Sequence, residues 1–83
     1  MPSDEQVTEY IEQARRHVEV GRLLIKRQKE MVERHRVEGR DVKPAQDLLA
    51  AYERTQQVFE RDLTRLELMK TVSQTMQAKI DDH

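Results

Sequence analysis

Cysteine and tryptophan are absent from this 83-residue sequence, which has only two glycines, two prolines, one phenylalanine and two tyrosines. Without cysteine the chain can form neither a disulfide nor a thiolate site, which fits a reducing compartment. So few glycines and prolines leave few points at which a helix must break. The scarcity of aromatic residues also argues against the stacking platforms with which proteins bind single-stranded nucleic acid.

Long hydrophobic runs are missing as well. No uninterrupted apolar segment approaches the roughly 20 residues of a membrane-spanning helix. The first ten residues, MPSDEQVTEY, are acidic and lack the apolar centre of a secretory signal. We therefore expect a soluble, cytoplasmic protein that makes no membrane contact.

Charge is abundant and nearly balanced. Charged residues make up 37% of the chain and hydrophobic residues 36%, with 15 Lys or Arg against 16 Asp or Glu. The resulting formal charge of -1 argues against a protein with general affinity for nucleic acid. This composition is typical of long amphipathic helices and coiled coils, and the length suits a single small domain.

A first helix is predicted over about residues 4–38. Ser3 can cap its first turn in a capping box with Gln6, and Gly39 can adopt the left-handed conformation that closes it. A helix surface that packs against a partner repeats every seven residues. Two such series form a seam, Ile11, Val18, Ile25 and Val32 with Val7, Ala14, Gly21, Gln28 and His35, and Tyr10, His17, Leu24 and Met31 flank it.

A second helix is predicted over about residues 42–80, after a turn at 39–41. Asp41 is the expected N-cap, and Pro44 is tolerated in the first turn because its missing N–H has no partner there. So short a link makes the helices antiparallel neighbours. The predicted fold is an all-α antiparallel two-helix hairpin with a coiled-coil-like seam. The second helix has its own series, Ala45, Tyr52, Phe59, Leu66, Ser73 and Ile80, flanked by Leu48, Leu49, Leu63, Met69 and Met76.

The register of the hairpin follows from a turn centred near residue 40. Gly21 then faces Phe59, so that the glycine forms a slot for the only phenylalanine, with an exposed and tolerated glycine as the alternative. Gln28 faces Tyr52, and we expect a hydrogen bond to the Tyr52 hydroxyl that fixes the register, unless Gln28 faces solvent. The remaining expected pairs are Ala14 with Leu66 and His35 with Ala45.

A lone two-helix hairpin buries little apolar surface, and the apolar stripe is wider than one seam requires. The remedy we expect is a homodimer in the form of a four-helix bundle, and the alternative is docking on a different protein. The favoured function is thus a small protein–protein interaction or assembly module. The residues expected at the helix–helix or dimer interface are Ile11, Ala14, Val18, Gly21, Ile25, Gln28, Val32, Tyr52, Phe59, Leu63 and Leu66.

One segment of the first predicted helix is basic. Residues 14–36 hold eight Lys or Arg against three Glu. We expect a solvated face with ion pairs, both within the helix (Glu30 with Arg34, Glu12 with Arg16) and to carboxylates of the second helix. The alternative is a nucleic-acid-associated regulator or a contact with acidic lipid. The residues that would contact the anion are Arg15, Arg22, Lys26, Lys29 and Arg36.

No motif for chemistry is found. His17 and His35 are preceded at the third position by Ala14 and Val32, so the Glu-x-x-His pattern of di-iron bundles is absent. No nucleophile arrangement and no glycine-rich phosphate loop occurs. We expect no enzymatic activity, no cofactor and no metal, and we expect His35 to lie near the turn with its ring nitrogen hydrogen-bonded.

Two segments, RHVEVGRLLIKRQ and VEGRDVKPAQDLLAAYERT, resemble short uncharacterised bacterial helical-hairpin proteins. The shared pattern is H-(I/V)-x-x-G-x-x-x-I-x-x-Q, followed by G-x-D and A-x-x-L-L. The resemblance implies the hairpin shape and a bacterial origin, and it implies no activity. The matching residues are His17, Val18, Gly21, Ile25, Gln28, Gly39, Asp41, Ala45, Leu48 and Leu49.

Overall fold

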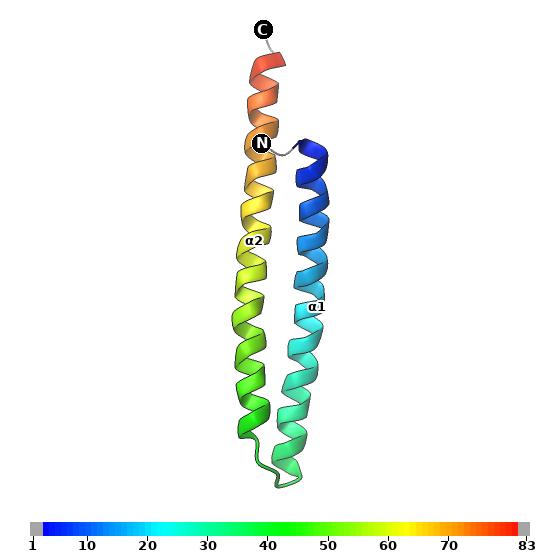
Figure 1. Cartoon of the computed structure of the whole chain (residues 1–83), viewed down its shortest axis with the longest axis vertical. Coiled ribbons are helices and arrows are strands. Elements are labelled where there is room, and N and C mark those ends of the chain that lie inside the picture. The colour runs from blue at the N-terminus through cyan, green and yellow to red at the C-terminus, as the bar shows by residue number, and fades with distance from the viewer. Residues whose placement is uncertain (1–2, 82–83) are drawn as a thin grey trace.

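The protein is a rod made of two helices that lie side by side in opposite directions (Figure 1). A computed structural model describes the backbone of residues 3–81 and the side chains of residues 3–76. Helix α1 spans Asp4–Val37 and helix α2 spans Lys43–Asp81. The rod measures 70 × 17 × 14 Å. Within residues 3–81 the chain is helical except at Ser3 and in the linker 38–42. Residues 3–81 contain no strand.

Helix α1 begins with the expected capping box. The Ser3 hydroxyl accepts a hydrogen bond from the backbone N–H of Gln6 at 3.2 Å. In return the Gln6 side-chain oxygen accepts from the backbone N–H of Ser3 at 3.0 Å. Asp4 and Glu5 add negative charge in the first turn, which is favourable beside the positive end of the helix dipole. The prediction from Ser3 and Gln6 is therefore confirmed.

Helix α1 ends in a Schellman motif built around Gly39. The amide of Arg40 donates to the carbonyl of His35 at 2.8 Å, and the amide of Gly39 donates to the carbonyl of Arg36 at 3.2 Å. Gly39 has a φ of 72°, a left-handed conformation that other residues adopt only at a cost. Gly39 closes the helix as the sequence predicts.

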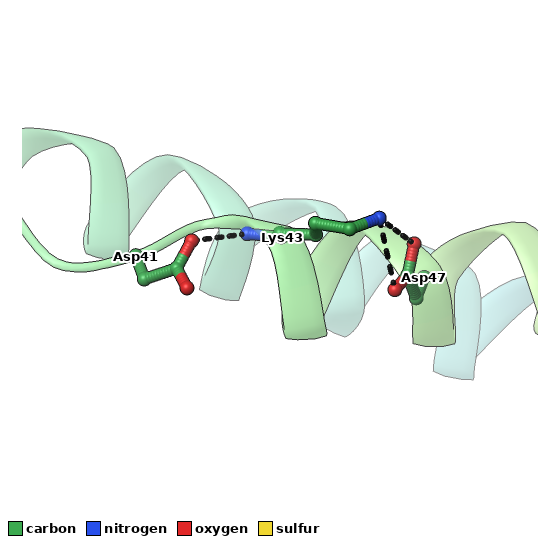
Figure 2. A network of polar contacts seen from close by, with 3 residues as sticks. All are labelled: Asp41, Lys43 and Asp47. Atoms are coloured by element: carbon green, nitrogen blue, oxygen red, sulfur yellow. Dashed lines mark hydrogen bonds and ion pairs between the residues drawn. The ribbon is translucent and has the colours of Figure 1, made fainter.

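The start of α2 differs from the expectation for Asp41. Gln46 N–H donates to the carbonyl of Val42, so the first helical hydrogen bond starts at Val42, which is the N-cap position. Asp41 lies one residue earlier, and its carboxylate accepts from the backbone amide of Lys43 at 3.1 Å (Figure 2). The Lys43 ammonium then meets both carboxylate oxygens of Asp47 at 3.4 Å. Asp41 thus satisfies the first amide of α2 without being its N-cap.

The buried core is a thin seam between the two helices. It contains mainly small and β-branched residues, and no large side chain among the described residues is completely buried. The predicted seam residues Gly21, Ile25, Tyr52, Phe59, Leu63 and Leu66 are only half-buried. A single hairpin therefore leaves much of its apolar stripe open. The buried residues are Val7, Ile11, Ala14, Val18, Gln28 and Val32 of α1 and Ala45 and Gln56 of α2.

The register differs from the predicted one by one to two helical turns. Phe59 lies against His17 rather than Gly21, and Ala45 meets Gln28 rather than His35. The cause is the linker, because its last residues, 40–42, are not helical and the chain turns back beside the last turn of α1 before α2 begins (Figure 1). Helix α2 consequently starts above the end of α1 (Figure 1). The predicted register assumes that the two helices diverge directly from a turn centred near residue 40. It therefore takes no account of the linker residues that run back along α1.

Candidate protein interaction surface

Two buried glutamines connect the helices, one from each. The side-chain amide of Gln28 in α1 donates to the carbonyl of Ala45 in α2 at 2.9 Å. The side-chain amide of Gln56 in α2 donates to the carbonyl of Val18 in α1, also at 2.9 Å. Each glutamine is 6% exposed, so water does not compete with these bonds. The predicted hydrogen bond between Gln28 and the Tyr52 hydroxyl is wrong. The shifted register brings the Ala45 carbonyl to Gln28 instead.

Gly21 makes room for Gln56 and not for Phe59. A Cβ atom at position 21 would collide with Oε1 of Gln56, and the three atoms nearest to it all belong to the Gln56 amide. The predicted slot for Phe59 is therefore wrong, although the small residue does face a large one across the seam. Gly21 allows the Gln56 side chain to cross the seam and reach the Val18 carbonyl.

Gln56 is the residue that sequence reasoning missed. It belongs to the seven-residue series Leu49, Gln56 and Leu63, which lies next to the predicted series of Ala45, Tyr52 and Phe59. A polar residue in an otherwise apolar series of this kind is the signal that could have identified it. Its amide oxygen is buried and accepts no hydrogen bond within the described structure.

The His17 and Phe59 rings mark the centre of one side of the hairpin. Their centroids are 5.0 Å apart, and the ring planes are tilted by 37°. Two adjoining depressions share these two rings. The central depression has almost wholly apolar walls, and the other lies toward the N-terminus of α1 and adds Tyr10, Ala14, Asp62, Arg65 and Leu66. Together they form the apolar groove, whose central part is lined by His17, Val20, Gly21, Leu24, Tyr52, Thr55, Gln56 and Phe59.

The apolar groove remains open in the single chain. Val20 is 56% exposed and Leu24 is 38% exposed, although both line its central part. Seven-residue spacing extends the same side of α1 to Met31, and the same side of α2 to Leu48 and Met69. These three side chains are exposed as well. The groove is thus the middle of an apolar surface that continues along the rod.

The opposite side of the seam has a different chemistry. Its furrow is polar and is lined by Thr8, Arg15, Glu67, Lys70 and Gln74, among others. Seven-residue spacing places Arg15, Arg22, Lys29 and Arg36 in one row along this side of α1. The hairpin therefore has one apolar side and one polar side.

Among the described side chains, the basic segment forms one ion pair within α1, Arg36 with Glu33, and not the pairs that the sequence predicts. The ion pairs within 4 Å in this part of the chain are Arg36 with Glu33, Arg40 with Glu38 and Lys43 with Asp47. All three are exposed, and such pairs contribute little to stability. The predicted pairs within α1, Glu30 with Arg34 and Glu12 with Arg16, are therefore wrong, as is the expected pairing of its arginines with α2 carboxylates.

His35 also differs from its prediction. It is half-buried near the end of α1, but its Nδ1 atom is buried and has no hydrogen-bond partner in the described structure. Among the residues described, no three His, Asp or Glu side chains lie close enough together to hold a metal ion. Neither α1 nor the described part of α2 has an apolar stretch long enough to cross a membrane.

Comparisons with known protein families, with curated proteins and with solved structures find no match to this chain.

Proposed function

We propose that this protein is a small protein–protein interaction module that assembles as a homodimer. The apolar groove of one copy packs against the apolar groove of a second copy, and the product is a four-helix bundle. The observation that carries this proposal is the open central part of the groove, where Val20 and Leu24 are exposed beside the rings of Tyr52 and Phe59.

Burial of the groove supplies the stability that the thin seam lacks. Complete burial of an aliphatic or aromatic side chain contributes about 1.5–3 kcal/mol relative to full exposure. The seam residues Ile25, Tyr52, Phe59 and Leu66 are half-buried in one chain, so each still has apolar surface to lose to a partner. A second hairpin would also cover Val20 and Leu24, which the seam does not use.

A second copy fits this surface in shape, area and charge. The groove runs along a rod 70 Å long and 17 Å wide, and another rod of the same length matches it. A face of this size offers on the order of 1,000 Å² per copy, comparable to the roughly 800 Å² per partner of a stable interface. The central part of the groove contains no Lys, Arg, Asp or Glu, so two identical faces do not repel each other there.

The test uses two adjacent leucines. Leu24 lines the groove, whereas Leu23 does not, and both are exposed in the single chain. Because successive residues of a helix point about 100° apart, Leu24→Glu places a charge in the proposed interface and Leu23→Glu places it outside. We expect sedimentation equilibrium to give a dimer mass for the wild type and for Leu23→Glu, and a monomer mass for Leu24→Glu.

Circular dichroism of the same samples separates lost assembly from lost folding. A helical monomer of Leu24→Glu supports the interface, and the milder Leu24→Ala variant replaces it if the charge unfolds the chain. A wild-type protein that remains monomeric at millimolar concentration overturns the homodimer. Two variants with equal dimer affinity overturn the assignment of the groove.

A second candidate function is contact with an anionic polymer such as nucleic acid. Its supporting observation is that Arg15, Arg22, Lys26 and Lys29 form no ion pair within 4 Å with any described carboxylate. Such binding weakens as salt rises, because released counterions drive it. A mobility-shift assay with duplex DNA at low and high salt tests it, and the absence of any shift at low salt contradicts it.

A further inference from the structure

His17 lies in the middle of the apolar groove. Its ring packs against Phe59 with a centroid distance of 5.0 Å, and it lines both depressions of the groove. His17 is exposed in the single chain, so water solvates the imidazole in either protonation state. A second copy seated in the groove would cover His17 and remove that water.

The charge of a histidine depends on pH in the range where proteins work. Histidine is the side chain that ordinarily gains or loses its charge between about pH 5 and pH 8. Among the described residues that line the groove, His17 is the one of this type. The neutral ring packs as an aromatic surface, whereas the protonated ring brings a positive charge that is costly to bury without a partner.

The surroundings of His17 offer little compensation for such a charge. Its neighbours on the same side of α1, three or four positions away, are uncharged, and they are Gln13, Ala14, Val20 and Gly21. The adjacent charged residue on α1, Arg16, is positive as well. From α2, the adjoining depression contributes Asp62, but Arg65 accompanies it with the opposite charge. The remaining α2 side chains of the central part carry no charge at neutral pH, and they are Tyr52, Thr55, Gln56 and Phe59.

We propose, on the basis of the homodimer above, that His17 makes assembly depend on pH, with the dimer favoured at neutral pH and weakened in mild acid. The separated chain takes up a proton at His17 in water, whereas the dimer has to bury the resulting charge. A fall in pH favours the state that binds more protons, which here is the separated chain. The partner copy presents the same groups, so each dimer that separates takes up two protons.

This dependence does not require a particular alignment of the two hairpins. His17 belongs to the central part of the groove, and that part is covered whether the two linkers lie at the same end of the bundle or at opposite ends. The two-fold axis places one His17 from each copy in the same interface in both cases. Two protonated rings in one interface also repel each other.

Sedimentation equilibrium of the full chain at about pH 7.5 and about pH 5.5 tests the proposal, because a histidine changes its charge between these values. We expect the dimer dissociation constant to be at least about tenfold higher at the lower pH, since two protons are taken up per dimer. Both values lie above the range in which exposed carboxylates ordinarily titrate. Circular dichroism at each pH shows whether the chain stays helical.

His17→Gln removes the ionisable ring and keeps a polar side chain. We expect its dissociation constant to differ by less than about threefold between the two pH values, because no group in the central part of the groove then titrates. His17→Leu is a second neutral variant, used if glutamine weakens the dimer too far to measure. His35→Gln is the matched control, because His35 is half-buried near the end of α1 and lines neither depression. This control should keep the pH response of the wild type.

Each contrary result has a distinct meaning. A wild-type dimer of equal affinity at both pH values overturns the role of His17 and leaves the homodimer intact. A tighter dimer at the lower pH also overturns it, because the closed groove then favours the protonated ring, as a pairing with Asp62 would. A wild-type pH response that persists in both neutral variants overturns the assignment to His17. The absence of a dimer at the higher pH overturns the homodimer itself.

Discussion

The Oε1 atom of Gln56 fills the space that a side chain at Gly21 would occupy. This relationship explains why a glycine lies inside a 34-residue helix, where it is unfavourable by about 1 kcal/mol relative to alanine. The compensation is a buried hydrogen bond from the Gln56 amide to the Val18 carbonyl. Gly21 and Gln56 therefore act as one unit in the seam.

The two residues should show energetic coupling. In the wild-type background, Gly21→Ala gains up to about 1 kcal/mol of helix propensity but displaces the Gln56 amide, which loses a bond worth about 1 kcal/mol. We expect little net change in the free energy of unfolding. In the Gln56→Ala background, the same substitution should stabilise the protein by about 0.5–1 kcal/mol, since no amide is displaced. Urea denaturation of the wild type, the two single variants and the double variant, all at the same protein concentration, measures this double-mutant cycle. An equal effect of Gly21→Ala in both backgrounds contradicts the coupling.

Gln28 should contribute more to the uniqueness of the register than to stability. Gln28→Met keeps the length of the side chain and removes its bond to Ala45, while the Ala45 carbonyl keeps its place in the helical ladder of α2. We expect a free energy of unfolding within about 1 kcal/mol of the wild type. We also expect additional backbone amide signals in NMR spectra, because an apolar seam permits other registers. A strongly destabilised variant with a single set of signals contradicts this role.

The capping box should stabilise the start of α1 in a graded way. Ser3→Ala removes the acceptor for the Gln6 amide and should lower the free energy of unfolding by about 1 kcal/mol. Ser3→Gly should cost only a few tenths of a kcal/mol, because glycine is tolerated at an N-cap. Thermal denaturation measures both variants, and faster hydrogen exchange at Gln6 should accompany the loss in Ser3→Ala. Equal melting temperatures for these two variants argue against the role of the hydroxyl.

Gly39 should respond to substitution for a different reason than Gly21. A Cβ atom at position 39 has no neighbour within 4 Å, so there is room for a side chain. The cost of Gly39→Ala lies in the left-handed backbone, and we expect a loss of about 1–2 kcal/mol. Gly39→Asn should lose less, because asparagine tolerates this conformation better. Chemical denaturation of the two variants tests this order, and a loss for asparagine as large as for alanine contradicts it.

Sequence signals from neighbouring residues predicted the ends of α1 well, but the register between the two helices was predicted less well. Ser3, Gln6 and Gly39 mark the ends of α1 because a cap depends on neighbouring residues and on backbone conformation alone. The register depends instead on the path of the linker, which returned along α1 and displaced Phe59 from Gly21 to His17.

The polar contacts of the seam were predictable only in part. Gln28 was recognised in the seam, but its acceptor is a backbone carbonyl, and any residue type can supply one. Gln56 is hard to recognise from the sequence, because the neighbouring seven-residue series with Tyr52 and Phe59 has the larger apolar side chains. Both series face α1, and the glutamine belongs to the second.

One side of the rod is apolar and the other is polar, and this difference limits how many chains the proposed assembly can contain. When two copies join through their apolar grooves, the furrow containing Arg15 and Glu67 points outward from each of them. In the proposed dimer, each copy would use the same face, and a face-to-face pair related by a two-fold axis is closed. Such an assembly would end at two chains and would not propagate into a fibre.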